Sequence, residues 1–152
     1  MNPYTLARYH TKAAALLGKP LPTAEQEGED PDSADLVYEA YGDLLRELTR
    51  DRKTYPLVFQ ELVNYGFRRN LWGMKAIGTA IAALSTAIQV GVAVLALLGK
   101  SRQPGAGDMA FLLVDVFMLG CWLFLITPDW VRVAAEAYAD RLLAASENLE
   151  PK

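Results

Sequence analysis

Cysteine and histidine are almost absent from this chain, which has one residue of each, Cys121 and His10. A single cysteine excludes an intramolecular disulfide, and one Cys with one His falls short of the ligands that a zinc site needs. His10 stands beside Tyr9 without metal-ligand spacing, so we expect it to pack against neighbours or to lie at the surface. We predict neither a metal nor a cofactor.

The motifs of common enzyme classes are also missing. The chain has no phosphate loop of the type G-x-x-x-x-G-K-[ST] and no H-E-x-x-H pair, and the glycines around Ala106 form only a short turn. The net charge is −3, so there is no basic excess for nucleic acid. We therefore predict that the protein is not an enzyme and does not bind nucleic acid.

Two further features are missing, an N-terminal signal sequence and β-type alternation. Arg8, His10 and Lys12 interrupt the first residues, which leaves no apolar signal core. No run alternates apolar and polar residues with a period of two, so no sheet is expected. The expected fold class is therefore all-α.

What the chain does have is two long apolar runs, residues 76–99 and residues 109–127, joined by a short loop over residues 100–108. The first run carries no charge and exceeds the length that indicates a membrane span. The second contains Asp115, which costs about 2.5 to 3.5 kcal/mol at the membrane centre, but its large apolar residues offset that cost. We predict a two-helix transmembrane hairpin. The alternative is a soluble protein with a buried hydrophobic hairpin, for which a chain this short has little covering material.

Amphipathic helices are predicted on both sides of this hairpin. Asn2 and Pro3 can start an N-terminal helix over residues 1–18, and residues 33–75 read as helices leading into the membrane, the first capped by Ser33. Thr127, Pro128 and an acid in the first turn start a C-terminal helix over residues 128–152. Its apolar stripe favours packing against the N-terminal helices or a second copy over lying on anionic lipid, because its polar face is acidic.

An acidic segment separates the first two helical regions. Residues 25–35 contain six acids and no base, with prolines nearby, so we predict a flexible linker over residues 19–32. A cation site is the alternative, since carboxylates suit hard ions, but the EF-hand spacing is missing.

The ends of the apolar runs indicate the topology. Arg68, Arg69 and Lys75 precede the first run, and the excess of basic residues there places both termini in the cytoplasm. Trp72 and Trp130 stand just outside the two runs, as interfacial anchors do. The two arginines could also touch lipid phosphates. We expect an integral protein of a bacterial cytoplasmic membrane.

One face of the first apolar run is small or polar, and the opposite face is aliphatic. Because lipid does not drive helices together hydrophobically, close approach through small residues marks the side that packs on protein. The predicted packing face comprises Gly78, Ala82, Ala93 and Ala96, with Ser85 and Gln89 in the same stripe.

Asp115 and Gln89 are predicted to lie at the same depth. Both are about 3 to 5 Å from the midplane toward the loop, at a rise of about 1.5 Å per residue. In one interpretation a protonated Asp115 bonds Gln89 or Ser85 and holds the helices together. The alternatives are an ion or proton path and a water pocket on the loop side.

From these features we expect a small membrane protein that acts as an anchored oligomerisation or partner-binding module. Its partners would be membrane lipid and either copies of itself or another membrane or cytoplasmic protein. The runner-up is a pore-forming or channel-like subunit in which several copies place Gly78, Ser85, Gln89 and Asp115 around a central axis.

Overall fold

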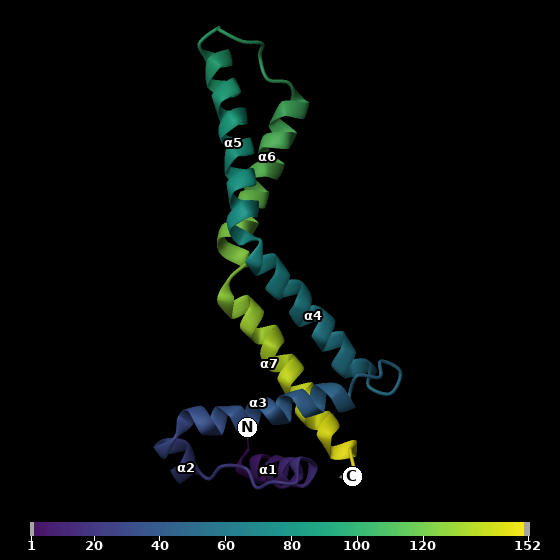
Figure 1. The fold of residues 1–152 in the computed structure, drawn as a ribbon. Helices are drawn as coiled ribbons and strands as arrows, with labels where there is room; N and C mark the ends of the chain where they lie inside the picture. Colours follow the sequence, from purple (N-terminus) through teal and green to yellow (C-terminus); the bar gives the residue numbers. More distant parts are fainter. Residues whose placement is uncertain (1, 151–152) are drawn as a thin grey trace. The chain divides into compact units, whose positions relative to one another are not determined.

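The computed structural model describes residues 2–150, which are helical without any strand in that range. The helices are α1 (Pro3–Leu17), α2 (Ala24–Glu29), α3 (Pro31–Leu48), α4 (Pro56–Gly73), α5 (Lys75–Leu97), α6 (Ala106–Gly120) and α7 (Pro128–Ala145), shown in Figure 1. A π-helical turn, η1 (Cys121–Leu125), continues α6, and a 3-10 turn, η2 (Ser146–Asn148), follows α7. The all-α prediction is confirmed for the described residues.

The chain divides into two units. The first, which we call the helical unit, comprises residues 1–64 and 135–152, and the second, the hairpin unit, comprises residues 65–134. Each is described below by itself.

The core of the helical unit joins N-terminal and C-terminal segments. Leu45 of α3 is 1 % exposed and lies in one cluster with Ala13 of α1, Val58 of α4 and Leu142 of α7. Leu149, beyond η2, belongs to the same cluster. An ion pair between Arg8 and Glu147 adds a contact between α1 and η2. The prediction that the C-terminal helix packs against the N-terminal helices is therefore confirmed.

The predicted flexible linker over residues 19–32 is wrong for Ala24–Glu29, which form α2, and for Pro31 and Asp32, which begin α3. Thr23 accepts a bond from the Gln26 backbone, and the Gln26 side chain accepts one from the Thr23 backbone, so the two make a capping box. Glu27 accepts a hydrogen bond from the Tyr38 hydroxyl of α3. Burial, together with this acceptor, raises the pKa of Tyr38 to about 12. The acidic composition hid a helix in which Glu25 and Glu27 lie in the first turn and Glu27 bonds to α3.

Asp30, and not Ser33 as predicted, caps α3. Its carboxylate accepts the Ser33 backbone N–H at 3.1 Å, and Pro31 occupies the first helical position. Hydrogen bonds from the Ser33 side chain and backbone lower the pKa of Asp30 below its ordinary value of 3.8. In the turn before α4, hydrogen bonds from Thr54 and Lys53 lower the pKa of Asp51 in the same way.

These two hydrogen-bonded aspartates predict a loss of stability in acid. A carboxylate whose folded pKa is depressed stabilises the fold above its ordinary pKa, and that contribution is lost as the pH falls through the folded value. The free energy of unfolding of the helical unit should therefore fall between about pH 5 and pH 2, and less steeply in Asp30→Asn. Chemical unfolding followed by circular dichroism measures this slope. Asp35→Asn, an acid of α3 that does not cap it, is the control, and equal slopes for wild type and Asp30→Asn would contradict the assignment.

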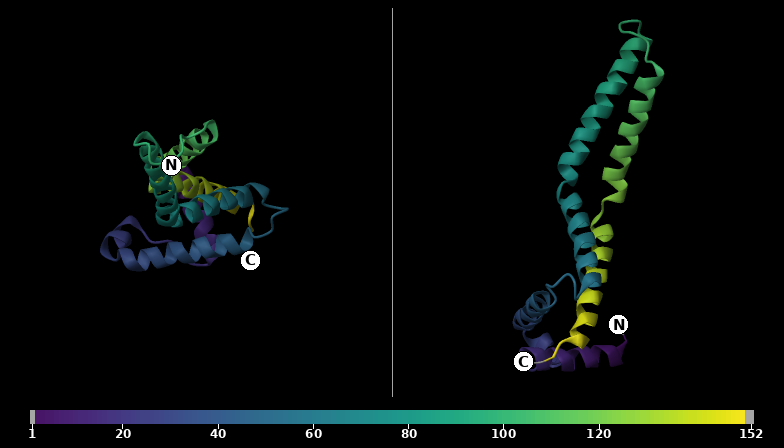
Figure 2. Two further views of the ribbon diagram at one scale, coloured as in Figure 1. Left: turned by 90° about the horizontal axis from the view of Figure 1, so that it is seen from above. Right: turned by 90° about the vertical axis from the view of Figure 1, so that its right-hand side faces the viewer.

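The hairpin unit contains two helices long and apolar enough to cross a membrane, Lys75–Leu97 and the continuous Ala106–Leu125 segment. They run antiparallel and side by side, as Figures 1 and 2 show. The bounds of these two helices differ by one to three residues from the predicted spans. The loop between the helices is therefore shorter than the predicted loop over residues 100–108. Gly99, with φ +68°, ends α5 in a Schellman motif in which the Lys100 N–H bonds the Leu95 carbonyl.

The start of α5 is marked by a break in the helix, which sequence alone left open. Met74 separates α4 from α5, although bonds from Met74 N–H to Asn70 O and from Gly78 N–H to Met74 O continue across it. After η1, Ile126 and Thr127 are not helical, and Thr127 accepts the Trp130 N–H at 3.2 Å. This confirms Thr127 as the cap of α7, which ends at Ala145 and not at residue 152.

Candidate functional site

Three polar side chains meet between α5 and α6. The Ser85 hydroxyl donates to Asp115 Oδ2 at 2.6 Å, and Gln89 Nε2 donates to the same oxygen at 2.5 Å. Ser85 and Gln89 are one helical turn apart on α5, so both side chains reach one point on the facing helix. The structure thus brings together Gln89 and Asp115, which the sequence placed at one depth, and Ser85, the other partner expected for Asp115. All three are partly buried.

The remaining contact surface of α5 follows the stripe of small residues. Ala82 is 7 % exposed, Ala96 is 1 % exposed, and Gly78 and Ala93 are partly buried. On the opposite side the large aliphatic side chains are exposed: Ile77, Ile81, Leu84, Ile88, Val92 and Leu95. The exposed fractions, 65 % for Ile81 and 64 % for Leu84, show that nothing in the described chain covers this face.

Among the glycines of the hairpin unit, Gly78 is the one that leaves no room for a side chain. A Cβ built on Gly78 would lie 2.3 Å from Cε2 and Cζ2 of the Trp122 indole. Real Cβ atoms do not approach other atoms so closely, so the ring lies where only glycine leaves room. Trp122 belongs to η1, and nothing in the sequence distinguishes it from the other apolar residues of its run.

At the other end of the hairpin, the loop folds back on the helices. Arg102 makes a two-pronged ion pair with Asp108, at 2.8 and 2.9 Å, and Asp108 also accepts the Gly105 N–H. The Gln103 amide donates to the Ala96 carbonyl at 3.2 Å. These bonds hold the loop over the end of α5 and the start of α6.

A cavity of about 190 Å³ lies between α5, α6 and this loop. Gln89 and the Arg102–Asp108 pair line it, and the rest of the lining is apolar: Ile88, Val92 and Ala93 of α5, Met109 and Leu112 of α6, and Pro104 of the loop. The cavity therefore extends from the loop to one member of the polar cluster.

Lys75 has a structural role that the sequence did not reveal. Its ammonium donates to the Ile126 carbonyl at 2.8 Å and to the Leu123 carbonyl at 3.2 Å. Pro128 lacks an N–H, so the helix ends there and leaves upstream carbonyls without helical partners. The feature of the sequence that indicates this role is Pro128 at the end of an apolar run. The carbonyls before the proline lack helical N–H donors and need another donor.

The predicted interfacial anchors differ in their surroundings. Arg68 donates to the Trp130 carbonyl at 2.9 Å, and its guanidinium stacks over the Trp130 ring at 4.9 Å. Arg69 lies over the Tyr65 ring at 5.7 Å. Trp72 is 45 % exposed. Arg68 and Trp130 thus make a contact between α4 and α7 inside the hairpin unit.

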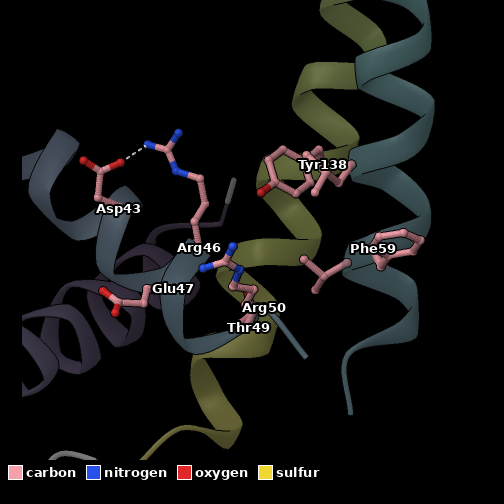
Figure 3. A pocket seen from close by; sticks show the side chains of 9 residues that line it. Asp43, Arg46, Glu47, Thr49, Arg50, Phe59 and Tyr138 are labelled. Atoms are coloured by element: carbon pink, nitrogen blue, oxygen red, sulfur yellow. Dashed lines mark ion pairs between the residues drawn. The ribbon is translucent and has the colours of Figure 1, made fainter. Parts of the chain in front are cut away.

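The helical unit carries an open groove of about 730 Å³ between the end of α3, the start of α4 and α7 (Figure 3). Arg46 and Arg50 alternate there with Asp43 and Glu47, and an ion pair of 2.6 Å joins Arg46 to Asp43. Val58, Phe59, Leu62 and Tyr138 supply apolar surface. Burial raises the pKa of Tyr138, and the nearby Arg46 acts in the opposite direction. The groove therefore presents both signs of charge beside apolar and aromatic side chains.

His10 belongs to the helical unit and Cys121 to the hairpin unit. His10 packs edge-on against Tyr38, with ring centroids 6.2 Å apart, and Cys121 is a free, partly buried thiol in η1. Among the described residues, no three His, Cys, Asp or Glu side chains are grouped so that they could hold a metal ion.

Compared with known proteins, the chain matches no family model, no curated protein and no solved structure.

Proposed function

We propose that this chain is an integral membrane protein in which the α5–α6 hairpin is the anchor and the helical unit binds a protein partner, without catalysing a reaction. The observation that carries the proposal is the distribution of side chains on α5. Its large aliphatic residues are exposed and its small and polar residues face α6. In water such a surface is an aggregation hazard, whereas in a bilayer it is the lipid-facing side.

The Ser85–Gln89–Asp115 cluster supports an anchor over a pore. In a pore these side chains would line a central axis between copies, exposed to water. Here Ser85 and Gln89 both donate to Asp115 within one hairpin, which satisfies polar groups that hydrocarbon cannot. We propose that the hydrogen bonds of this cluster hold α5 and α6 together.

The groove in the helical unit supports partner binding. Apolar and aromatic side chains beside charges of both signs are what a segment of another protein can complement. The occupant can be a second copy of this chain or a different membrane or cytoplasmic protein. Basic residues before α5 favour a cytoplasmic side for both termini, in a bacterial cytoplasmic membrane.

The anchor is tested by extraction of the full chain from liposomes at alkaline pH. We expect the protein to stay with the lipid, because the exposed faces of α5 and α6 bind hydrocarbon, while a soluble protein trapped in the same vesicles is released. Release of the chain would contradict the anchor.

The mass of the protein in mild detergent tests the class of partner. A complex above the 16.7 kDa monomer supports self-association, and a strict monomer excludes a second copy as the occupant of the groove.

A further inference from the structure

We propose that the cavity between α5, α6 and the loop is a water-filled vestibule that brings water and protons to Asp115 from the loop side only. This rests on the proposed function in one respect, that the hairpin spans a bilayer.

The size and chemistry of the cavity fit water. Liquid water occupies about 30 Å³ per molecule, so the cavity of about 190 Å³ has room for about six molecules. Buried water needs two to four polar partners, and Gln89, Arg102 and Asp108 provide them within one lining. A cavity of the same size with apolar walls alone would stay dry.

The position of the cavity links the loop to the polar cluster. Gln89 is eight residues before the end of α5 at Leu97, which is about 12 Å along the helix at about 1.5 Å per residue. Half of the hydrocarbon thickness is about 15 Å, so a vestibule ending at Gln89 crosses most of the loop-side half of the bilayer. Gln89 contacts both the cavity and Asp115 Oδ2.

The charged and polar groups around Asp115 agree with one-sided access. From α5 it faces Ser85 and Gln89, and toward the loop the charges on the cavity wall are Arg102 and Asp108, which pair with each other. Beyond the cluster on the other side, the Trp122 ring fills the space against Gly78. Water that enters at the loop therefore ends its path at the cluster.

The test is the reaction of introduced cysteines with a charged, membrane-impermeant methanethiosulfonate, on the full chain in liposomes and with Cys121 changed to Ser. Only a thiol in contact with water forms the reactive thiolate. Ala93→Cys reports on the cavity wall and Asp115→Cys on its end. Val94→Cys and Val116→Cys, one residue away on the exposed faces, are the matched controls. Lys100→Cys in the loop reports whether the hairpin spans the bilayer.

When the reagent is on the loop side, we expect the thiols of Ala93→Cys and Asp115→Cys to react at least about tenfold faster than those of Val94→Cys and Val116→Cys. When the reagent is on the other side, we expect no such reaction. Rates equal to those of Val94→Cys and Val116→Cys, with Lys100→Cys still labelled from one side only, would overturn the vestibule and leave the anchor standing. Reaction of Ala93→Cys alone would also overturn it, because the path would stop short of Asp115. Labelling of Lys100→Cys from both sides would instead show that the spanning hairpin itself is wrong.

Discussion

Gly78→Ala is expected to lower the free energy of unfolding of the hairpin by about 1 to 3 kcal/mol, the range seen when a packed interior receives an extra methyl group. The added Cβ would meet the Trp122 ring at 2.3 Å. The atoms that the new methyl group would meet belong to the rigid indole ring and not to the end of a flexible side chain, so the ring must shift to make room. Unfolding of the full chain in mixed micelles, followed by tryptophan fluorescence, measures the change.

Two variants separate this clash from a general effect of glycine. Gly91 lies on the same helix with open space around its missing Cβ, so Gly91→Ala should leave stability unchanged or raise it slightly. Removing the ring by Trp122→Ala should make Gly78→Ala nearly harmless in the double variant, because the two positions are coupled. A Gly78→Ala protein as stable as wild type would show that the contact is not formed.

Asp115→Leu is expected to weaken the association of α5 with α6 by about 1 to 2 kcal/mol, at the upper end of measured interhelical hydrogen bonds in membranes. Leucine fills the space of the carboxylate but leaves the Ser85 hydroxyl and the Gln89 amide without their acceptor. Asp115→Asn keeps an acceptor oxygen at the same place and should cost only a few tenths of a kcal/mol. The same mixed-micelle unfolding measures both variants.

The cluster predicts a specific pattern of coupling. Gln89→Leu should be less harmful in the Asp115→Leu background than in wild type, because the bond it removes is already lost. A matched control is Thr86→Val, which removes a hydroxyl bonded to a carbonyl of its own helix and not to α6. If Asp115→Asn and Asp115→Leu lowered stability equally, the proposed role of Asp115 in holding α5 to α6 would be wrong.

Much of the fold was predictable because it depends on local chemistry. The spacing of small residues on the first apolar run gave the face of α5 that is covered, and Thr127-Pro128 gave the start of α7. The shared depth of Gln89 and Asp115 followed from helix geometry alone, because an antiparallel hairpin fixes which residues are level.

The errors and omissions have tertiary causes. The prediction of a linker in the acidic segment is wrong because composition does not show that Glu27 bonds Tyr38 or that Asp30 caps α3. In the sequence Lys75 indicates only topology, as a charge beside an apolar run. In the structure it bonds the carbonyls of Leu123 and Ile126, about fifty residues away in the chain. The Gly78–Trp122 contact depends on which side of η1 faces α5, and a π-helical turn shifts that register away from the one a regular helix predicts.

The central claim, that the hairpin crosses a bilayer with both termini on one side, is tested most directly by cysteine labelling in intact cells that express the full chain. The background is Cys121→Ser, and single cysteines replace the exposed Glu25, Lys100 and Glu150. An impermeant maleimide should label Lys100→Cys from outside, and should label Glu25→Cys and Glu150→Cys only after the membrane is opened. Labelling of all three positions from the same side would contradict the account.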